Sequence, residues 1–226
     1  MQRRTFITGA ALFVLGACTN GGRVAGSSST APSRPFPPPR RSPGIGLDGA
    51  LDRRRSIRSF TDESLGEEAI AHLLWAAQGV TASWGGRTAP SAGARYPIEV
   101  SVATGEGLHR YVPDEGRTVV LTSEDRRPLI ANATGGLDAA LQAPALFVIS
   151  GIVARTAEKY GDRAERYVQM EAGHICQNML LEATGLGLAA VPVGAFSDDD
   201  LRTALGVGDE ELPLYVVPVG HPAAEG

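Results

Sequence analysis

Four arginines stand close together in the stretch "DRRRSIRSF", residues 52–60: Arg53, Arg54, Arg55 and Arg58. The guanidinium group is a planar fork of N–H donors that binds a phosphate at two points, and Ser56 adds a hydroxyl donor in the same turn. The whole chain carries a formal net charge of −4, whereas general nucleic-acid binding requires a broad basic face. The pattern therefore predicts a local phosphate site and no nucleic-acid partner, with a solvated helix end as the simpler alternative.

A second stretch, "APSAGARYP" at residues 89–97, has almost no side-chain bulk at its centre, which consists of Pro90, Ser91, Ala92 and Gly93. A chain needs such residues where its backbone lies against a flat ligand or donates N–H groups to it. A tight surface turn would use the same residues. Further along, "PVGAF" at residues 192–196 ends a predicted strand. Gly194 in this stretch would let the backbone approach a ligand.

Titratable residues offer fewer clues. Lys159 beside Tyr160 could form a proton relay, although an exposed lysine next to a half-buried tyrosine is an equally simple arrangement. Glu171, His174 and Asn178 lie at helical spacing, where hydrogen-bonded pairing explains them as well as catalysis does. The histidines are dispersed, so no metal site is predicted: they are His72, His109, His174 and His221. Neither a G-x-G-x-x-G fingerprint nor a Walker A motif is present.

These residues must be positioned by a mixture of helices and strands. Apolar periodicity predicts helices over 47–55, 66–78 and 163–184, and a short helix from Ser197 to Leu205. A capping box of Ser64 and Glu67 is expected to start the second helix. Strands are predicted over 98–103, 108–112, 118–122, 145–153, 188–193 and 214–219. Because helices and strands do not alternate strictly, an α+β layer is favoured over a doubly wound sheet.

The N-terminal region predicts an export signal. A charged start and a short apolar run indicate a signal peptide over 1–17, too short to span a bilayer. The residues before Cys18 resemble a lipobox, and Arg3 with Arg4 resembles a twin-arginine signal; an ordinary signal with a chance cysteine is the alternative. Residues 18–46 are rich in Gly, Ser and Pro, and we expect a disordered tether. The protein would then be exported and anchored by lipid at Cys18, on the periplasmic or extracellular side.

Several motifs occur in one order: "RRSIRSF", "LLWAAQGVT", "RTAPSAGARYPIEV", "EKYGDRAERYVQMEAGHICQNM", "GLGLAAVPVGAF" and "PLYVVPVGHP". Together they resemble the nitroreductase superfamily, and within it the SagB-type dehydrogenase branch. The resemblance covers residues 47–222, and the folded domain is expected over 47–226. It implies an α+β flavoprotein with a central, mainly antiparallel sheet flanked by helices. It further implies an intertwined homodimer with two FMN sites at the subunit interface.

The resemblance also implies roles for particular residues. The phosphate and ribityl chain of FMN would be held by Arg54, Arg55, Ser56 and Arg58. The flavin ring would lie along Pro90, Ser91, Ala92 and Gly93, with its reactive edge near Val193, Gly194 and Ala195. Lys159 and Tyr160 match a catalytic Lys-Tyr pair of azoline dehydrogenases. Many relatives carry a basic residue after the last strand, where this chain has His221, so either His221 or the arginines alone must neutralise the phosphate.

The expected function is an FMN-dependent oxidoreductase that transfers hydride between a reduced donor, with NAD(P)H as a candidate, and a small-molecule or peptide acceptor. The flavin supplies the redox chemistry, and the protein supplies position and exclusion of water. An azoline dehydrogenase of SagB type is the enzymatic alternative. A flavin-binding lipoprotein without turnover is a second, and a binder of anionic polymers is a third. Membrane contact is expected through the lipid anchor only.

Overall fold

The computed structural model describes residues 33–35 and 45–223 of the 226-residue chain. The predicted signal peptide and Cys18 lie outside the described residues. Within the predicted tether, Ser33–Pro35 form strand β1, which pairs with strand β4 (Arg117–Thr122). These three residues therefore depart from the disorder expected for the tether, because β4 offers them its unpaired backbone edge.

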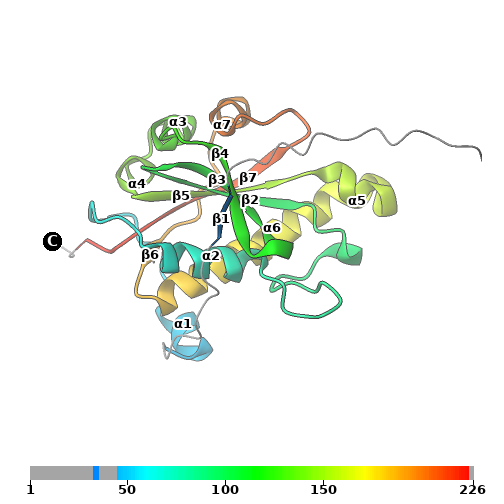
Figure 1. Ribbon diagram of the computed structural model, residues 1–226, viewed down its shortest axis with the longest axis horizontal. Helices are drawn as coiled ribbons and strands as arrows, with labels where there is room; N and C mark the ends of the chain where they lie inside the picture. The colour runs from blue at the N-terminus through cyan, green and yellow to red at the C-terminus, as the bar shows by residue number, and fades with distance from the viewer. Residues whose placement is uncertain (1–32, 36–44, 224–226) are drawn as a thin grey trace, which may run out of the picture. The chain divides into compact units, whose positions relative to one another are not determined.

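A single antiparallel sheet forms the centre of the domain (Figure 1). Its seven strands lie in the order β1-β4-β3-β2-β5-β7-β6, and every neighbouring pair is antiparallel. The remaining strands are β2 (Ile98–Thr104), β3 (Gly107–Val112), β5 (Ala145–Gly151), β6 (Ala189–Ala190) and β7 (Leu212–Gly220). The expected α+β fold with an antiparallel sheet is confirmed.

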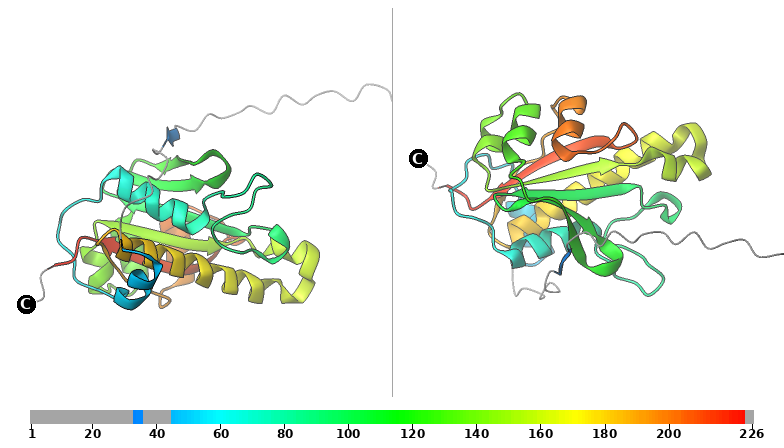
Figure 2. Two further views of the ribbon diagram at one scale, coloured as in Figure 1. Left: turned by 90° about the horizontal axis from the view of Figure 1, so that it is seen from below. Right: turned by 45° about the horizontal axis from the view of Figure 1, so that its top comes forward.

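Helices cover both faces of this sheet (Figures 1 and 2). One face carries α1 (Leu47–Arg53), α2 (Glu67–Gln78) and α6 (Ala164–Gly185). The other carries α3 (Arg127–Ala133), α4 (Asp138–Gln142) and α7 (Asp198–Leu205). Helix α5 (Val153–Tyr160) follows β5 at one end of the sheet. Three short 3-10 turns, Ala92–Ala94, Pro113–Glu115 and Gly161–Arg163, complete the described elements.

Two apolar cores result, one on each face. Alternate residues of the fully buried β5 point to opposite sides, so Phe147 joins the core under α2 and α6 while Leu146 and Val148 join the core under α3, α4 and α7. Helix α6 buries Val168, Ala172, Ile175, Cys176 and Met179, as its apolar spacing predicted. A strand buried on both faces explains why β5 reads as a continuous apolar run.

Element boundaries differ from the expectations at several places. The capping box is wrong: α2 begins after Gly66, which makes no side-chain cap, and Glu67 is the first helical residue. The strand expected to reach residue 153 ends at Gly151, where an added Cβ would lie 2.5 Å from Val168 of α6. The strand over 188–193 is reduced to β6 because Pro192 has no N–H to donate. The cap at Ser197 is confirmed, since its Oγ accepts from the Asp200 N–H at 3.3 Å.

Three helices were not expected at all: α3, α4 and α5. Each has only five to eight residues, which gives apolar periodicity little length in which to show. None of the helices in the described ranges is both long and apolar enough to cross a membrane.

Candidate active site

The arginine segment, residues 54–58, connects α1 to the edge of the sheet. The Ile57 N–H donates to the Ala190 carbonyl of β6 at 3.2 Å, which fixes the backbone while the side chains project outward. Arg55 Nη1 donates to the carbonyls of Asp52 and Arg54 at 2.9 and 2.7 Å. Arg58 Nη1 donates to the Ser56 carbonyl at 3.3 Å. These contacts orient the guanidinium groups without neutralising them.

The charges of this segment have no acidic counterpart in the described part of the chain. No ion pair joins Arg54, Arg55 or Arg58 to a described carboxylate, whereas other arginines of the domain do form such pairs, for example Arg110 with Glu211 and Arg202 with Asp199. Arg55 and Arg58 are exposed and Arg54 is half-buried. Three neighbouring positive charges that remain without partners repel one another, so an anion bound there would be favoured.

The end of β7 returns to the same place. The Thr61 N–H donates to the His221 carbonyl at 2.9 Å, and Phe60 forms a β-bridge with Pro222. His221 therefore lies beside the residues that follow Arg58, as its predicted role requires. Its Nε2 lies 3.8 Å from the Glu63 carboxylate. A contribution of His221 to phosphate binding stays a prediction.

Residues 193–195 leave the sheet next to β7. Val193 is buried and exchanges two backbone hydrogen bonds with Val216, at 2.8 and 2.9 Å. Gly194 and Ala195 are exposed, and an added Cβ at Gly194 would meet no atom within 4 Å. The surrounding chain thus does not require glycine at this position. The open space beside it is compatible with the predicted approach of a ligand.

The small-residue segment, residues 90–93, contacts the predicted catalytic pair. Gly93 has a left-handed backbone with φ 61°, and an added Cβ would lie 2.8 Å from Tyr160 Oη and 2.9 Å from Lys159 Nζ. The Lys159 ammonium lies 5.5 Å from the centroid of the Tyr160 ring. Residues from two separate predicted motifs are therefore neighbours in the fold, at the end of α5.

Polar contacts hold the turn that follows residues 90–93 in an unusual backbone conformation. Ala94 and Tyr96 also have positive φ, at 53° and 44°, which is rare for residues with a side chain. The Tyr96 N–H donates to Ser91 Oγ at 2.9 Å. The Arg87 guanidinium lies 4.3 Å from the centroid of the Tyr96 ring. Such conformations cost about 1–3 kcal/mol each and persist only where the surroundings fix them.

Helix α5 is tied both to this segment and to the sheet. Arg95 Nε donates to the Arg155 carbonyl at 3.0 Å, and Arg95 also pairs with Glu158. Arg155 Nη2 lies 2.6 Å from Glu99 Oε1 on β2. These contacts hold Lys159 and Tyr160, at the end of the same helix, against residues 90–93.

Glu171 belongs to this part of the site, although its sequence pattern left hydrogen-bonded pairing and catalysis open and Glu171 was not among the predicted site residues. Its side chain lies in α6 with 3% of the residue exposed. Burial raises the pKa of the Glu171 carboxyl to about 7, against the opposing effects of hydrogen bonds from Ser91 and the Ala92 N–H and of the positive charge of Arg87. An acidic residue within the apolar face of a predicted helix was the signal that could have identified it.

Cys176 lies one and a half turns further along α6 and is a small buried side chain without a disulfide partner among the described residues. Its burial raises the pKa of the thiol to about 12. A thiol that stays protonated is a poor nucleophile, which leaves Cys176 in the core and outside the site.

Two groups of predicted site residues, the arginine segment and residues 90–93, lie at opposite ends of the sheet, whereas Val193 lies between them, bridged to Val216 opposite Val148. Ala145 pairs with Val219 at the end where the arginine segment meets β6, whereas Gly151 pairs with Leu212 at the end where residues 90–93 lead into β2. The seven residues of β5 separate these ends by roughly 20 Å. The two ends are visible in Figure 2, with α1 near one and α5 near the other. One chain therefore does not bring all predicted FMN contacts to one point.

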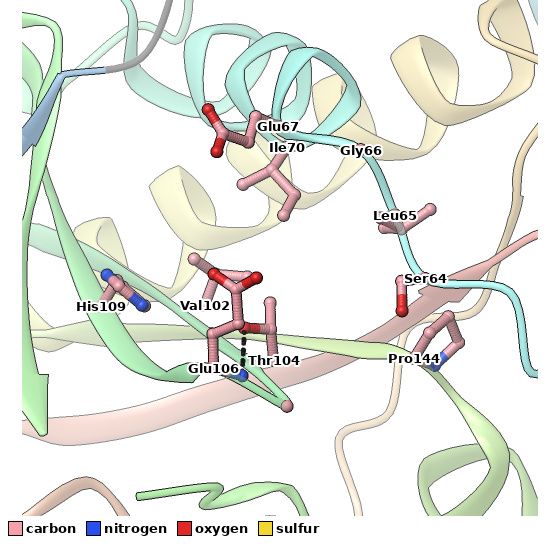
Figure 3. A pocket seen from close by; sticks show the side chains of 11 residues that line it. Ser64, Leu65, Gly66, Glu67, Ile70, Val102, Thr104, Glu106, His109 and Pro144 are labelled. Atoms are coloured by element: carbon pink, nitrogen blue, oxygen red, sulfur yellow. Dashed lines mark hydrogen bonds between the residues drawn. The ribbon is translucent and has the colours of Figure 1, made fainter. Parts of the chain in front are cut away.

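A separate pocket of about 290 Å³ lies between the start of α2 and the turn from β2 to β3 (Figure 3). Glu67, Glu106 and His109 line it, and the Glu106 N–H donates to Thr104 Oγ1 at 3.2 Å. None of the predicted site residues lines this pocket. Its two carboxylates would repel a phosphate-bearing ligand. Within the described ranges, no group of three or more His, Cys, Asp or Glu side chains is arranged to hold a metal ion.

Comparison with known proteins identifies the family. The sequence model of the nitroreductase family matches residues 51–221. The chain belongs to the nitroreductase family. It is 40% identical over 184 residues to a protein of Methanocaldococcus jannaschii named as a nitroreductase, covering 78% of this chain and 91% of that protein.

Two further similarities agree with this assignment. The chain is 30% identical over 176 residues to a protein of Bacillus subtilis named FMN reductase (NADPH), covering 75% of this chain and 63% of that one. This chain thus spans less than two thirds of that relative. A crystal structure from Ralstonia eutropha, described as a nitroreductase, superposes with a TM-score of 0.77 at 32% identity, covering 84% of this chain and 89% of that one. The nitroreductase-like fold is confirmed.

Proposed function

We propose that this chain is an FMN-dependent oxidoreductase that transfers hydride between a reduced donor of the NAD(P)H class and a small-molecule acceptor. The observation that carries this proposal is the arginine segment of a nitroreductase-family chain, whose guanidinium groups have no described acidic partner. A phosphate on a flat cofactor would supply that missing charge. The relative named FMN reductase (NADPH) supports both the cofactor and the donor.

The residues present fit FMN in charge and in shape. Arg54, Arg55 and Arg58, with the Ser56 hydroxyl, would hold the phosphate and the ribityl chain. Residues 90–93 carry little side-chain bulk and would lie along the ring, while the open space at Gly194 would receive its edge. When bound, the flavin would supply the capacity to accept and donate hydride. The chain itself would bind and orient the flavin and exclude water from it.

The same geometry supports a homodimer with shared sites. Since the two groups of predicted contacts lie roughly 20 Å apart along the sheet, we propose that the arginine segment of one copy and residues 90–93 of the other complete each site. Apolar side chains are exposed on α1, with Leu47 66% and Leu51 53% exposed. An apolar groove of about 330 Å³ runs between α1, α2 and α6, and a second copy would cover it.

Tyr160 and Lys159 would handle protons at the ring. The hydroxyl of Tyr160 can donate or accept a proton at Oη, and the adjacent ammonium of Lys159 would stabilise its ionised form. This contact with Gly93 also favours the second candidate function, a SagB-type azoline dehydrogenase, in which Tyr160 would take a proton from a peptide-borne ring as hydride leaves it. The two functions share a cofactor and differ in the direction of electron flow.

The purified protein tests the main proposal. Yellow protein with an oxidised-flavin spectrum that NADPH or NADH bleaches under anaerobic conditions is the expected result. Colourless protein that does not bind added FMN would contradict every flavin-based function. Bound FMN that dithionite reduces but NAD(P)H does not would indicate another donor or a flavin carrier without turnover. Conversion of a thiazoline or oxazoline within a peptide to the thiazole or oxazole, with loss of a hydride to the flavin and of a proton, would identify the azoline dehydrogenase.

We also propose that the protein is exported and anchored by lipid at Cys18. The support comes from the sequence alone: the charged start, the short apolar run and the small residues before Cys18. Cys18→Ala should move the protein from the membrane fraction to the soluble fraction in the native host. Continued retention of that variant in the membrane fraction would contradict the anchor.

A further inference from the structure

Glu171 faces the small-residue segment from α6, and the role inferred for it rests on the proposed FMN site. The Ser91 hydroxyl and the Ala92 N–H face the Glu171 carboxyl as hydrogen-bond donors and lower the pKa that burial raises. Ser91 Oγ in turn accepts from the Tyr96 N–H at 2.9 Å. One carboxyl thus connects α6 to three residues of a turn that also contains the left-handed Gly93, Ala94 and Tyr96.

The Glu171 carboxyl also has a place for a proton. Its Oε1 is buried and has no hydrogen-bond partner among the described residues. An ionised carboxylate with one dry, unpaired oxygen is costly, whereas the neutral acid can carry its proton on that oxygen. The surrounding residues Val168, Ala172 and Ile175 are fully buried and apolar. The unpartnered Oε1 and the apolar surroundings therefore favour the protonated form of Glu171 more strongly than water favours it for an exposed glutamate.

Several charged and titratable groups lie on the elements that pack against α6. Arg87 precedes the segment, and its positive charge favours ionised Glu171. Arg87 is itself hydrogen-bonded to Gln78 of α2 at 2.9 Å and paired with Asp114 at 3.5 Å. Other titratable groups near α6 include Lys159 and Tyr160 on α5, His72 on α2, which pairs with Glu182, Tyr111 on β3, and His174 on the next turn of α6. The elements packed against α6 also carry Glu67 and Glu68 on α2, Arg155 and Glu158 on α5, and Glu99 on β2, of which Arg155 and Glu99 pair with each other.

We propose that Glu171 is a positioning residue that holds residues 90–93 through Ser91 and Ala92, and that uptake of a proton at its Oε1 accompanies FMN binding. Flavin against the segment would cover the partly exposed Ser91, Ala92 and Gly93 from solvent, and its phosphate would add a negative charge to the same site. Each effect disfavours the carboxylate. The pKa of Glu171, about 7 in the chain without FMN, would therefore be higher in the complex.

The sign of the pH dependence follows from this rise. A ligand that raises the pKa of an acid binds most tightly where the acid is already protonated, below its pKa in the free protein. Affinity for FMN should then fall as pH rises through about 7 and level off above the pKa of the complex. Each pKa unit added by FMN corresponds to a decrease of about tenfold.

The test is the dissociation constant of FMN, measured by flavin fluorescence from about pH 5.5 to about pH 8.5 for the wild type and for Glu171→Gln. Glutamine carries no charge and resembles the neutral acid, so this variant should keep the low-pH affinity of the wild type across the range. The phosphate of FMN titrates equally in both proteins and cancels in the comparison. Identical pH profiles would overturn the proton uptake.

Glu171→Ala tests the positioning role. It removes the acceptor for Ser91 and Ala92, so FMN affinity should fall about tenfold at low pH, and Glu171→Gln should restore it. Equal affinity for FMN in the alanine variant and the wild type would overturn this role. Thermal unfolding and circular dichroism of both variants show whether each is folded.

A measurement on the wild type covers the case in which a variant does not fold. Calorimetric titration of FMN near pH 7.5, in buffers of different ionisation enthalpy, counts the protons taken up, because the phosphate is already largely dianionic there. Net proton uptake on FMN binding is expected. Binding of FMN without proton uptake would overturn the proposal. Failure of the wild type to bind FMN would instead contradict the proposed function, so the two failures are distinguishable.

Discussion

The two ends of the sheet hold the two groups of site residues in different ways. The arginine segment is exposed, its contacts are with backbone carbonyls, and its charges have no described acidic partner. Residues 90–93 instead lie between two helices. Gly93 contacts Lys159 and Tyr160 of α5, and the buried Glu171 faces the segment from α6. The first region is suited to supply charge to a ligand, and the second is suited to supply a fixed surface. Changes in the two should therefore have different consequences.

Removal of charge from the arginine segment should have the largest effect. Arg54→Ala combined with Arg58→Ala would delete two charged donors to the phosphate, and FMN affinity should fall about a thousandfold. The fold should persist, because neither side chain is buried. Flavin fluorescence titration measures the affinity, and Arg53→Ala is the matched control because Arg53 is exposed at the end of α1 and is not among the predicted phosphate ligands. Full FMN occupancy in the double variant would refute the assignment.

Mixing two inactive variants would test whether the regions act across a dimer. One variant carries the two arginine substitutions, and the other carries Gly93→Val, which would clash with Lys159 and Tyr160. If each site uses one region from each copy, random exchange of subunits leaves about a quarter of the sites intact. NADPH oxidation by the mixture, after mild unfolding and refolding together, measures this recovery. No recovery from stable mixed dimers would place both regions of a site in one chain.

Tyr160→Phe should separate catalysis from FMN binding, because it removes a proton-carrying group beside residues 90–93 and leaves the arginine segment unchanged. Loss of the Oη proton should lower turnover about a hundredfold while FMN affinity and the flavin spectrum stay unchanged. Stopped-flow measurement of the reductive and oxidative half-reactions would show which one slows. Unchanged turnover in both half-reactions would remove Tyr160 from the mechanism.

His221→Ala should have the smallest effect. Its imidazole is partly exposed and lies 3.8 Å from Glu63, so any contribution to phosphate binding is reduced by solvent. FMN affinity should fall about threefold, measured with the same titration as the arginine variants. A loss as large as theirs would show that His221 replaces the basic residue that many relatives carry after the last strand.

Much of the fold could be predicted from local patterns. The apolar spacing of Val168, Ala172 and Ile175 predicted α6, and β-type runs predicted the central strands within one or two residues. The short helices α3, α4 and α5 could not be predicted, because tertiary packing stabilises helices of this length more than local preference does. The predicted capping box was wrong because Gly66, and not Ser64, occupies the N-cap position, so Glu67 is the first helical residue and not the third.

The sequence by itself determined the residue types on which the site depends: the clustered positive charges of residues 54–58, the low bulk of residues 90–93 and the pairing of Lys159 with Tyr160. These are properties of neighbours along the chain. Only the tertiary structure decided that Gly93 contacts Tyr160, that Glu171 is buried against Ser91, and that the two regions lie at opposite ends of the sheet. Contact, burial and the pKa of a carboxyl depend on segments far apart in sequence, which packing alone brings together.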